Sequence, residues 1–227
     1  MSQRYIPALG HAWLTGLYDP VLRFTMREAT FKTHLVAQAD LRAGHRILDL
    51  GCGTGTLTVQ IKQSQPEAEV VGLDGDADIL RRAVDKRDRA GVAFDLVQGL
   101  SDRLPFADQS FDRVLCSLLL HHLTTDAKRR TLAETLRVLR PGGQVHIADW
   151  GAPRGPLMRA AFLIIQLVDG FTTTDDNVNG RIPAMLRAAG LADVQVTRHL
   201  RTVYGSLSLL RGERPQALTR RIATGEP

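Results

Sequence analysis

The sequence predicts an α/β fold with a mostly parallel, doubly wound sheet of about seven strands. Short apolar segments alternate with segments of helical periodicity between residues 46 and 148, which is typical of a parallel sheet covered by helices. The last two strand-like segments, 194–198 and 203–210, are joined by a short link. Because a short link joins antiparallel strands, we expect the last strand to insert antiparallel to the others.

The first elements follow in order along the chain. Residues 19–40 are expected to be helical, because apolar side chains form a loose stripe there. Helical spacing of apolar residues predicts a helix over 57–61 that ends before Pro66, and a second helix over 79–84. Four short apolar runs are predicted strands, at 46–50, 70–73, 94–97 and 111–116.

A capped helix and a fifth strand come next. Thr125 and Asp126 are expected to begin a helix whose apolar face continues to Leu139. The turn Pro141-Gly142-Gly143 is expected to end this helix and to lead into a fifth strand over 144–148.

The chain is predicted to be one domain over residues 1–227, since this length gives one sizeable core. The N-terminal segment 1–40 is expected to be a helical lid over the site. Residues 151–190 are expected to be a helical insertion on the substrate side, with a polar break at 172–179.

The composition is that of a soluble globular chain, with 44% hydrophobic and 23% charged residues. Cys52 and Cys116 have no zinc spacing and indicate a reducing compartment. The net charge of +5 comes from scattered arginines without interleaved aromatic residues, so we expect no nucleic-acid partner. Residues 1–10 lack the apolar core of a signal peptide, and the apolar run 160–168 is too short to cross a bilayer. We therefore expect a cytoplasmic protein without stable membrane insertion.

A glycine-rich turn carries the sharpest chemical signal. Gly51, Gly53 and Gly55 follow a strand that ends near Asp49. Glycines let the backbone turn tightly and approach a ligand, and the helix that follows presents unpaired N–H groups. Asp74 ends the next strand, 23 residues after Gly51, at the spacing where a carboxylate grips a ribose diol. The combination favours a nucleotide-type site over a plain tight turn beside a surface acid.

The glycine spacing separates two classes of ligand. NAD sites use G-x-G-x-x-G, whereas this chain has G-x-G-x-G and Thr at position 56. A carboxylate at Asp49 would also crowd a pyrophosphate. It suits a ligand with an ammonium group and no phosphate, and S-adenosylmethionine is such a ligand.

Residues 45–150 closely resemble the class I S-adenosylmethionine-dependent methyltransferases, in particular the type 11 group that includes the ubiquinone and menaquinone C-methyltransferases. The resemblance rests on the glycine loop 48–55, the strand end 71–74, the segments 99–106 and 110–117, and the turn 140–143. It implies a Rossmann-like fold, S-adenosyl-L-methionine as the methyl donor, a site at the carboxyl ends of the strands, and no metal.

The resemblance also implies the cofactor contacts. Asp74 is expected to bind the ribose hydroxyls, and Gly75 and Asp76 to pack against adenine. Leu100, where many relatives have Asp, and Ser101 belong to the segment that reads the adenine edge. The whole expected cofactor-binding set is Asp49, Gly51, Cys52, Gly53, Gly55, Asp74, Gly75, Asp76, Leu100, Ser101 and Ser117.

Three residues are candidates for the acceptor side. Methyl transfer from a sulfonium needs mainly proximity, orientation and exclusion of water. Of the adjacent pair His121 and His122, His122 is the expected acceptor-facing group, with loop anchoring as the alternative. Asp149 ends the fifth strand at the same rim, with capping as the alternative, and Tyr18 is a candidate lid residue. No Cys or acid cluster is expected to complete a metal set with the two histidines.

We expect a methyltransferase that acts on a small, largely apolar acceptor molecule. Two alternatives stay open: a non-catalytic cofactor-binding protein of this fold, and a methyltransferase with a phospholipid or membrane-associated acceptor. A nucleotide-dependent oxidoreductase is disfavoured by the glycine spacing. The Asn/Asp-Pro-Pro-aromatic signature of amino-directed nucleic-acid methyltransferases does not occur in the sequence. The oligomeric state is not predicted.

Overall fold

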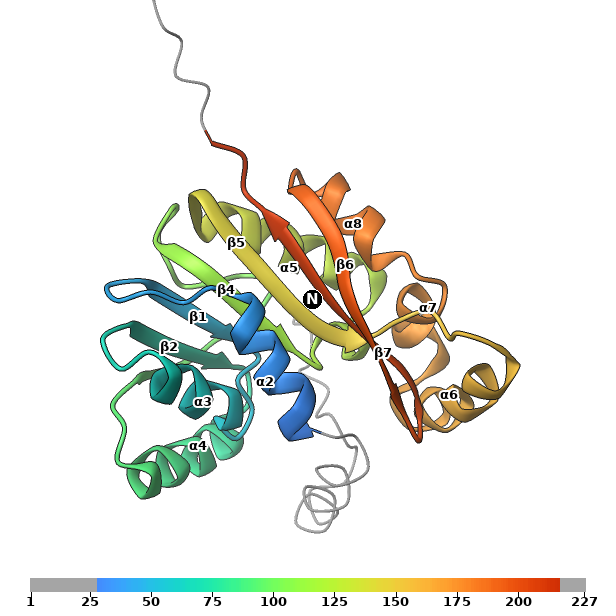
Figure 1. The fold of residues 1–227 in the computed structure, drawn as a ribbon, viewed down its shortest axis with the longest axis horizontal. Helices are drawn as coiled ribbons and strands as arrows, with labels where there is room; N and C mark the ends of the chain where they lie inside the picture. Colours follow the sequence, from blue (N-terminus) through green and yellow to red (C-terminus); the bar gives the residue numbers. More distant parts are fainter. Residues whose placement is uncertain (1–27, 217–227) are drawn as a thin grey trace, which may run out of the picture.

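A computed structural model describes residues 28–216 and shows one seven-stranded sheet (Figure 1). The strand order is β3-β2-β1-β4-β5-β7-β6. Strands β1 to β5 pair in parallel, and β7 pairs antiparallel with both β5 and β6. The strands are β1 (Arg46–Leu50), β2 (Glu69–Asp74), β3 (Asp95–Gln98), β4 (Phe111–Ser117), β5 (Leu139–Trp150), β6 (Ala192–Thr202) and β7 (Gly205–Glu213). The predicted fold class is confirmed, including the antiparallel last strand.

Helices cover both faces of the sheet. One apolar core joins α2 and α3 to one face of β1, and the other joins α5 and α8 to the opposite face. In Figure 1, α2 crosses the near face of the sheet and α5 lies behind it. The helices are α2 (Glu28–Gln38), α3 (Thr56–Ser64), α4 (Ala77–Ala90), the 3-10 turn η1 (Leu120–His122), α5 (Thr125–Val138), α6 (Pro156–Asp169), α7 (Phe171–Val178) and α8 (Ile182–Ala188).

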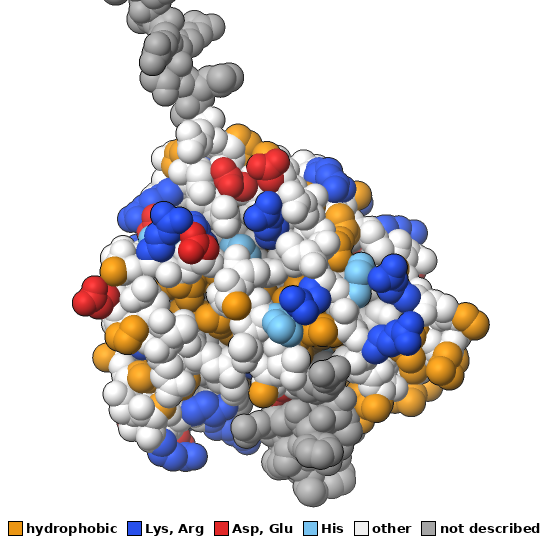
Figure 2. Space-filling view, viewed as in Figure 1, with side chains coloured by type: hydrophobic (Ala, Val, Ile, Leu, Met, Phe, Trp, Pro, Cys, Tyr) orange, Lys and Arg blue, Asp and Glu red, His pale blue; other side chains and the backbone are white. Residues whose placement is uncertain are grey.

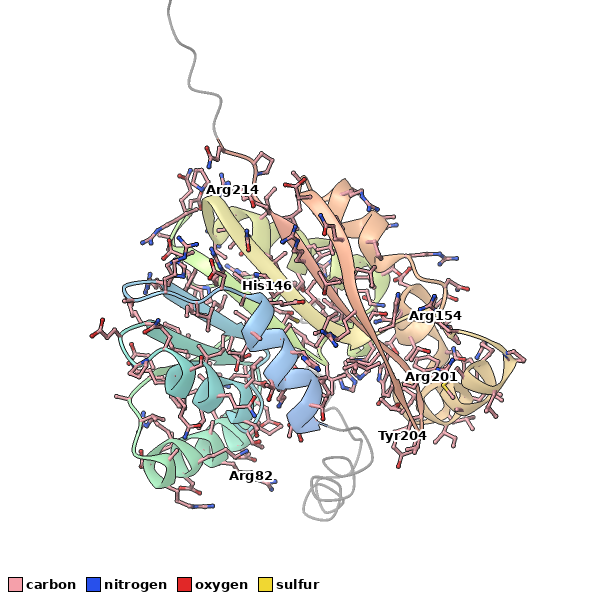
Figure 3. The ribbon with its side chains drawn as sticks, viewed as in Figure 1. Arg82, His146, Arg154, Arg201, Tyr204 and Arg214 are labelled. Atoms are coloured by element: carbon pink, nitrogen blue, oxygen red, sulfur yellow. The ribbon has the colours of Figure 1, made fainter. Side chains whose placement is uncertain are left out.

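The turn expected at Pro141-Gly142-Gly143 lies inside strand β5, so that expectation is wrong. Phe111 pairs with Leu139 and Arg113 with Gln144, which makes this stretch a bulge in the ladder between β4 and β5. A bulge tolerates a proline, which cannot donate a ladder hydrogen bond, and Gly142 has a φ of +76°. Arg214 (Figure 3) closes the bulge by exchanging backbone hydrogen bonds with Gly142 and Gly143.

The polar break expected at 172–179 is also wrong, because these residues form helix α7. The hydroxyl groups of Thr173 and Thr174 donate to the carbonyls of Asp169 and Gly170 one turn earlier. The polar side chains that suggested a break are therefore used inside the protein. The real interruption is Gly170, with a φ of +96°, between α6 and α7.

The last two strands form a longer hairpin than the sequence suggests. Thr202 pairs with Gly205, so Val203 and Tyr204 form the two-residue turn, and the strand expected at 203–210 begins after it. Tyr204 is labelled at this tip in Figure 3. Strand β6 is the edge of the sheet, and the tip packs beside α6, since a Cβ on Gly205 would lie 3.0 Å from the Phe162 ring.

Candidate functional site

The glycine loop between β1 and α3 has a backbone that only glycine adopts easily. Gly51, Gly53 and Gly55 have φ values of +72°, +54° and +75°. A Cβ on Gly51 would lie 3.0 Å from Leu119, and one on Gly55 would lie 3.1 Å from Ala83. A Cβ on Gly53 would meet no atom of residues 28–216 within 4 Å. Gly53 is therefore the point at which the loop backbone is open to a ligand.

Asp74, at the end of β2, holds the loop from the neighbouring strand. Its carboxylate accepts hydrogen bonds from the N–H groups of Gly53 (2.9 Å) and Asp76 (3.0 Å). Burial raises the pKa of Asp74, and these two N–H groups act against that rise. The Asp76 side chain accepts from the N–H groups of Asp78 and Ile79 and so caps α4. The carboxylate expected to bind a ribose thus lies beside the open position at Gly53.

Asp49 is a fully buried carboxylate beneath the loop. Thr58 donates a hydrogen bond of 2.6 Å to its Oδ2 atom, whereas its Oδ1 atom has no hydrogen-bond partner among the described residues. Burial raises the pKa of Asp49 to about 6. A buried carboxylate oxygen without a donor is costly, and an ammonium group would supply that donor.

The end of β4 supplies a second unpartnered polar atom. The Ser117 hydroxyl is buried and has no hydrogen-bond partner among the residues that the structure describes. Leu118, the next residue, has a φ of +55°, an uncommon conformation for a leucine that often accompanies functional sites. Its N–H donates to the carbonyl of Ala148, which ties β4 to β5 at this rim.

These features fit a ligand with an ammonium group and a ribose. The register pairs Leu50 with Leu73 and with Cys116, so Asp49, Asp74 and Ser117 all lie at the carboxyl end of the parallel strands. Ligands of open α/β sheets bind at this edge.

The other residues of the expected cofactor set lie in varied positions. Leu100 is 46% exposed. The Ser101 hydroxyl is engaged with Thr131 at 3.0 Å. Gly75 accepts a hydrogen bond from Gln98 through its carbonyl. The thiol of Cys52 is buried against Gly72, which turns it toward the sheet.

Asp149 and His121 form a buried pair at the end of β5. Asp149 is fully buried, and its Oδ1 atom lies 2.8 Å from Nδ1 of His121. It also accepts from the N–H groups of Leu120 and Trp150 and from the Asn177 amide. Burial lowers the pKa of His121, whereas the Asp149 carboxylate raises it. The effect of the carboxylate is the larger, so the pKa of His121 lies above its ordinary value. Asp149 thus acts on neighbouring protein groups, which favours a positioning role over direct contact with an acceptor.

His122 faces a different carboxylate. Its Nδ1 atom lies 3.7 Å from Oδ1 of Asp169, and Nε2 of His121 lies 3.6 Å from Oδ2 of the same residue. The Asp169 side chain is only 3% exposed, and its Oδ1 atom has no hydrogen-bond partner within residues 28–216. Burial and the charge on His121 lower the pKa of His122 to about 3, so its imidazole is neutral at neutral pH. With 30% of its side chain exposed, His122 is the more accessible of the two histidines.

The two histidines and Asp169 bring one ligand atom each to within 4.8 Å of one another. The sequence-based expectation that no acid joins the histidines is therefore wrong. Asp169 lies 47 positions away in the chain, and no local pattern indicates the contact. The expectation that the protein uses no metal stays a prediction.

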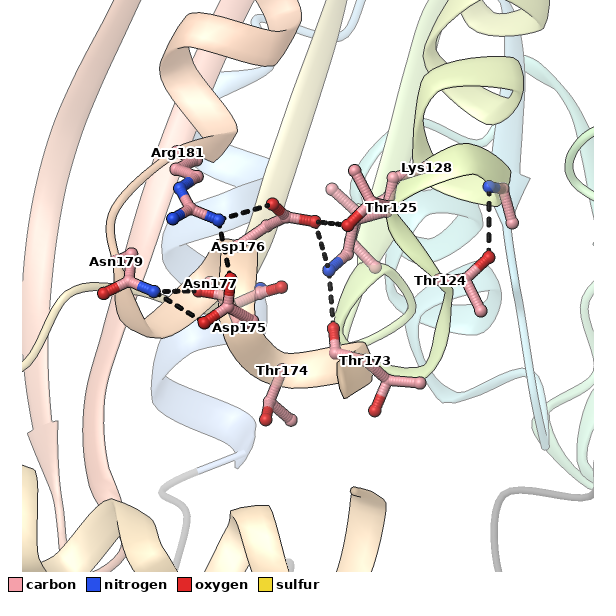
Figure 4. A network of polar contacts seen from close by, with 12 residues as sticks. Thr124, Thr125, Lys128, Thr173, Thr174, Asp175, Asp176, Asn177, Asn179 and Arg181 are labelled. Atoms are coloured by element: carbon pink, nitrogen blue, oxygen red, sulfur yellow. Dashed lines mark hydrogen bonds and ion pairs between the residues drawn. The ribbon is translucent and has the colours of Figure 1, made fainter. Parts of the chain in front are cut away.

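Helix α7 braces this cluster through a buried polar network (Figure 4). Lys128 of α5 is fully buried and donates to the carbonyl of Thr173 (2.6 Å) and to Asp176 (3.3 Å). Thr125 donates to the same carboxylate at 2.7 Å. Next along α7, Asn177 donates to Asp149 and to the carbonyl of Trp150. The insertion is thus locked to the end of β5, and only the fold reveals the roles of Lys128 and Asn177.

Tyr18, the expected lid residue, lies outside the described residues, as do residues 19–27 of the expected N-terminal helix. The described part of that segment is α2, within the predicted range. Among the described residues, no helix is both long and apolar enough to cross a membrane.

Comparisons with known proteins agree on one family. The family model described as "Methyltransferase domain" matches residues 47–143. A demethylmenaquinone methyltransferase of Clavibacter sepedonicus is 34% identical over 194 residues, which cover 76% of this chain and 75% of that protein. Other curated ubiquinone/menaquinone biosynthesis C-methyltransferases are 31–38% identical, but the chain spans only about half of their length.

Two solved structures illustrate the shared fold. The YcgJ protein from Bacillus subtilis has a TM-score of 0.67 at 21% identity, and the alignment covers 82% of this chain and 98% of the YcgJ chain. The [4+2]-cyclase SpnF has a TM-score of 0.65 at 18% identity, and the alignment covers 83% of this chain and 82% of the SpnF chain. At these identities the likeness concerns the fold alone.

Proposed function

The chain belongs to the class I S-adenosylmethionine-dependent methyltransferases, and from that premise we propose that it methylates a small, largely apolar acceptor. The observation that carries the proposal is the open backbone at Gly53, set between the carboxylates of Asp49 and Asp74. The relatives act on demethylmenaquinone and in ubiquinone or menaquinone biosynthesis, as their names state, which supports an apolar acceptor here.

In this proposal each end of the cofactor has its own protein groups. Asp74 binds the ribose hydroxyls, and Asp49, through its unpartnered Oδ1 atom, binds the ammonium group. The exposed Leu100 packs against the adenine. Bound S-adenosylmethionine supplies a methyl group already activated on a sulfonium. The protein therefore contributes mainly orientation and exclusion of water.

The acceptor lies in this proposal beside the histidines, which the buried aromatic pair Trp150 and Phe162 supports from the core side. Their ring centroids lie 5.5 Å apart, and the His121 ring lies 6.4 Å from Trp150. Neutral His122 accepts a hydrogen bond from an acceptor O–H group and so orients the acceptor for methylation. Asp169, with its Oδ1 atom 3.7 Å from Nδ1 of His122, holds the orientation of the imidazole ring. Asp149 positions His121, and Tyr18 closes the site as a lid residue.

A non-catalytic cofactor-binding protein is the second candidate. The likeness to the cyclase SpnF shows that this fold also occurs in a protein named for another reaction, so the fold alone does not establish methyl transfer. An acceptor embedded in a lipid phase is a variant of the first proposal, because the acceptor side borders an exposed apolar helix.

The test pairs binding with turnover. Calorimetry measures the affinity for S-adenosylhomocysteine, and release of S-adenosylhomocysteine from S-adenosylmethionine is then assayed with 1,4-naphthoquinols that carry no chain or a short prenyl chain. We expect binding and turnover in the wild type. His122→Ala should keep the affinity and lose most of kcat, whereas His199→Ala, which removes an exposed histidine on β6, should keep both. Binding without turnover on any acceptor would favour the non-catalytic candidate, and no binding would overturn the proposal.

A further inference from the structure

Helix α6 buries polar side chains and exposes apolar ones. Its inward face carries Phe162 and Ile165 together with Gln166 and Asp169, which are almost fully buried. Gln166 accepts a hydrogen bond from Arg159 and donates one to Thr174. The polar Gln166 on this face therefore has hydrogen-bond partners within the protein, and the exposed face of α6 carries the apolar side chains.

The outward side chains of α6 continue onto the start of α7 and the hairpin tip. We call this set the α6 surface: Leu157 (75% exposed), Leu163 (42%), Ile164 (51%), Leu167 (75%), Val168 (53%), Phe171 (53%) and Val203 (61%). Figure 2 shows hydrophobic side chains gathered at the lower right edge of the molecule, where α6 lies in Figure 1. A contiguous exposed apolar patch of this kind marks an interaction site.

Positive charge borders the α6 surface. Arg154, Arg159, Arg198 and Arg201 are exposed in α6, just before it, and in β6 near the hairpin tip. Arg154 and Arg201 are labelled at this border in Figure 3, and Lys and Arg side chains lie next to the apolar patch in Figure 2. Within residues 154–171 and 196–208 the one acid is Asp169, which is buried. These two segments therefore offer exposed arginines and no exposed carboxylate, and the next acid along α7, Asp175, is paired with Arg181.

We propose that the α6 surface docks the protein on an anionic lipid bilayer. Helix α6 lies in the plane of the headgroups, its leucines enter the acyl boundary, and the arginines contact the lipid phosphates. A helix with one apolar face and flanking arginines binds in this way. A second copy of the chain fits less well, because a two-fold contact through this face would bring arginines of like charge together.

Docking through α6 also orients the acceptor side. The last residue of α6 is Asp169, which lies against His121 and His122, so the rim of the site faces the bilayer. An apolar acceptor can then pass from the lipid phase to the histidines. This consequence rests on the proposed function, whereas the docking itself does not.

The test is flotation of the full chain with vesicles of phosphatidylcholine alone or with 30% phosphatidylglycerol. We expect binding to the anionic vesicles only, weakened by added salt because the arginine contacts are screened. The double variant Leu157→Glu and Leu167→Glu, at two positions that are each 75% exposed, should bind at least tenfold more weakly. Arg154→Glu with Arg201→Glu should also lose binding. Arg82→Glu on α4, on the opposite side of the molecule in Figure 3, is the matched charge control and should bind like the wild type.

Affinity for S-adenosylhomocysteine should be the same in all these variants, which shows that each is folded. No binding to anionic vesicles, or equal binding to neutral ones, would overturn the proposal. So would a dimer in light scattering that Leu167→Glu dissociates while vesicle binding is absent, since the surface would then pair with a second copy. Turnover of water-soluble naphthoquinols does not depend on docking, so failure in flotation with intact turnover would count against the docking alone.

Discussion

Gly53 and Gly44 share a backbone conformation but differ in surroundings. Both have a positive φ, +54° and +74°, and a Cβ on either would meet no atom of the described part of the chain within 4 Å. Gly44 lies in the loop before β1, whereas Gly53 lies between Asp49 and Asp74. Substituting each glycine therefore separates two effects. Both substitutions place a side chain on a left-handed backbone, but only the one at Gly53 removes a ligand contact.

Gly53→Ala and Gly44→Ala should each lower the free energy of unfolding by about 1–2 kcal/mol, the cost of a left-handed alanine. Only Gly53→Ala should lose affinity for S-adenosylhomocysteine, by at least tenfold, because its methyl group occupies the open side of the loop. Urea unfolding and calorimetry measure the two effects. Equal affinity in both variants would mean that the loop does not touch the cofactor at Gly53.

Asp49 is expected to destabilise the free protein. Its folded pKa of about 6 is above the model-compound value of 3.8, so the unfolded chain releases this proton first. Stability is therefore lost as pH rises from about 4 to 6, by up to about 3 kcal/mol.

Asp49→Asn keeps an oxygen for Thr58 and removes the charge. At pH 7 we expect the free variant to be about 1–3 kcal/mol more stable than the wild type, while its affinity for S-adenosylhomocysteine falls tenfold or more. Asp95→Asn, at an exposed acid of β3, is the control and should change neither. In the wild type, the affinity should rise as pH increases through 6, because the ionised carboxylate binds the ammonium group. A flat affinity across this range would argue against the contact.

At the scale of elements, α6 and α7 have different tasks. Phe162 is fully buried against Trp150, whereas its neighbour Leu163 is 42% exposed. Phe162→Ala should therefore cost about 3–5 kcal/mol of stability, and Leu163→Ala should cost little. Helix α7 holds its place through the buried ion pair of Lys128 and Asp176, in which Asp176 also lies 3.5 Å from Arg181.

Lys128→Met should lower the free energy of unfolding by up to about 3–5 kcal/mol, because the buried carboxylate of Asp176 loses one of its two cationic partners and keeps Arg181. Lys128→Met combined with Asp176→Leu should recover part of that loss. A double-mutant cycle by urea unfolding gives the coupling energy. Turnover should fall in both variants, because α7 carries Asn177, which braces Asp149. If the losses of Lys128→Met and Asp176→Leu simply add up in the double variant, the ion pair does not hold α7.

At the scale of the whole molecule, His146 in the interior strand β5 links stability to pH. Both of its ring nitrogens lack a hydrogen-bond partner among residues 28–216, and it is fully buried (Figure 3). Burial, with the charges of Arg113 and Arg211, lowers its pKa to about 3. The unfolded chain binds a proton near pH 6.5 and the folded one does not, so stability falls as pH drops below 6.5.

Between pH 7 and pH 5 this one histidine should remove about 2 kcal/mol of stability. His146→Leu should lose that much less over the same interval, as measured by urea unfolding at the two pH values. His199→Leu is the comparison at an exposed position on β6, where burial and Arg154 also lower the histidine pKa, and it should change the pH dependence much less than His146→Leu. An unchanged pH dependence in His146→Leu would show that His146 is protonated in the folded protein.

The sequence by itself determined the order of the elements, the antiparallel last strand and the loop of Gly51, Gly53 and Gly55. These features are local, because an apolar run, a glycine spacing or a short link between strands can be recognised without knowing its neighbours. The carboxylates of Asp49 and Asp74 follow from the same logic, since parallel strands end at one edge of the sheet.

Only the tertiary structure decided which groups meet on the acceptor side. Asp169 reaches the histidines and Asn177 reaches Asp149 across 28 or more positions of the chain, and such contacts depend on how α6 and α7 fold back over β5. The sequence also did not predict that α7 is a helix, for a related reason. Its polar side chains suggest a solvated turn, but they bind Lys128 and the backbone in the interior. Periodicity in a sequence shows that a side chain is buried or exposed, whereas packing decides which partner it finds.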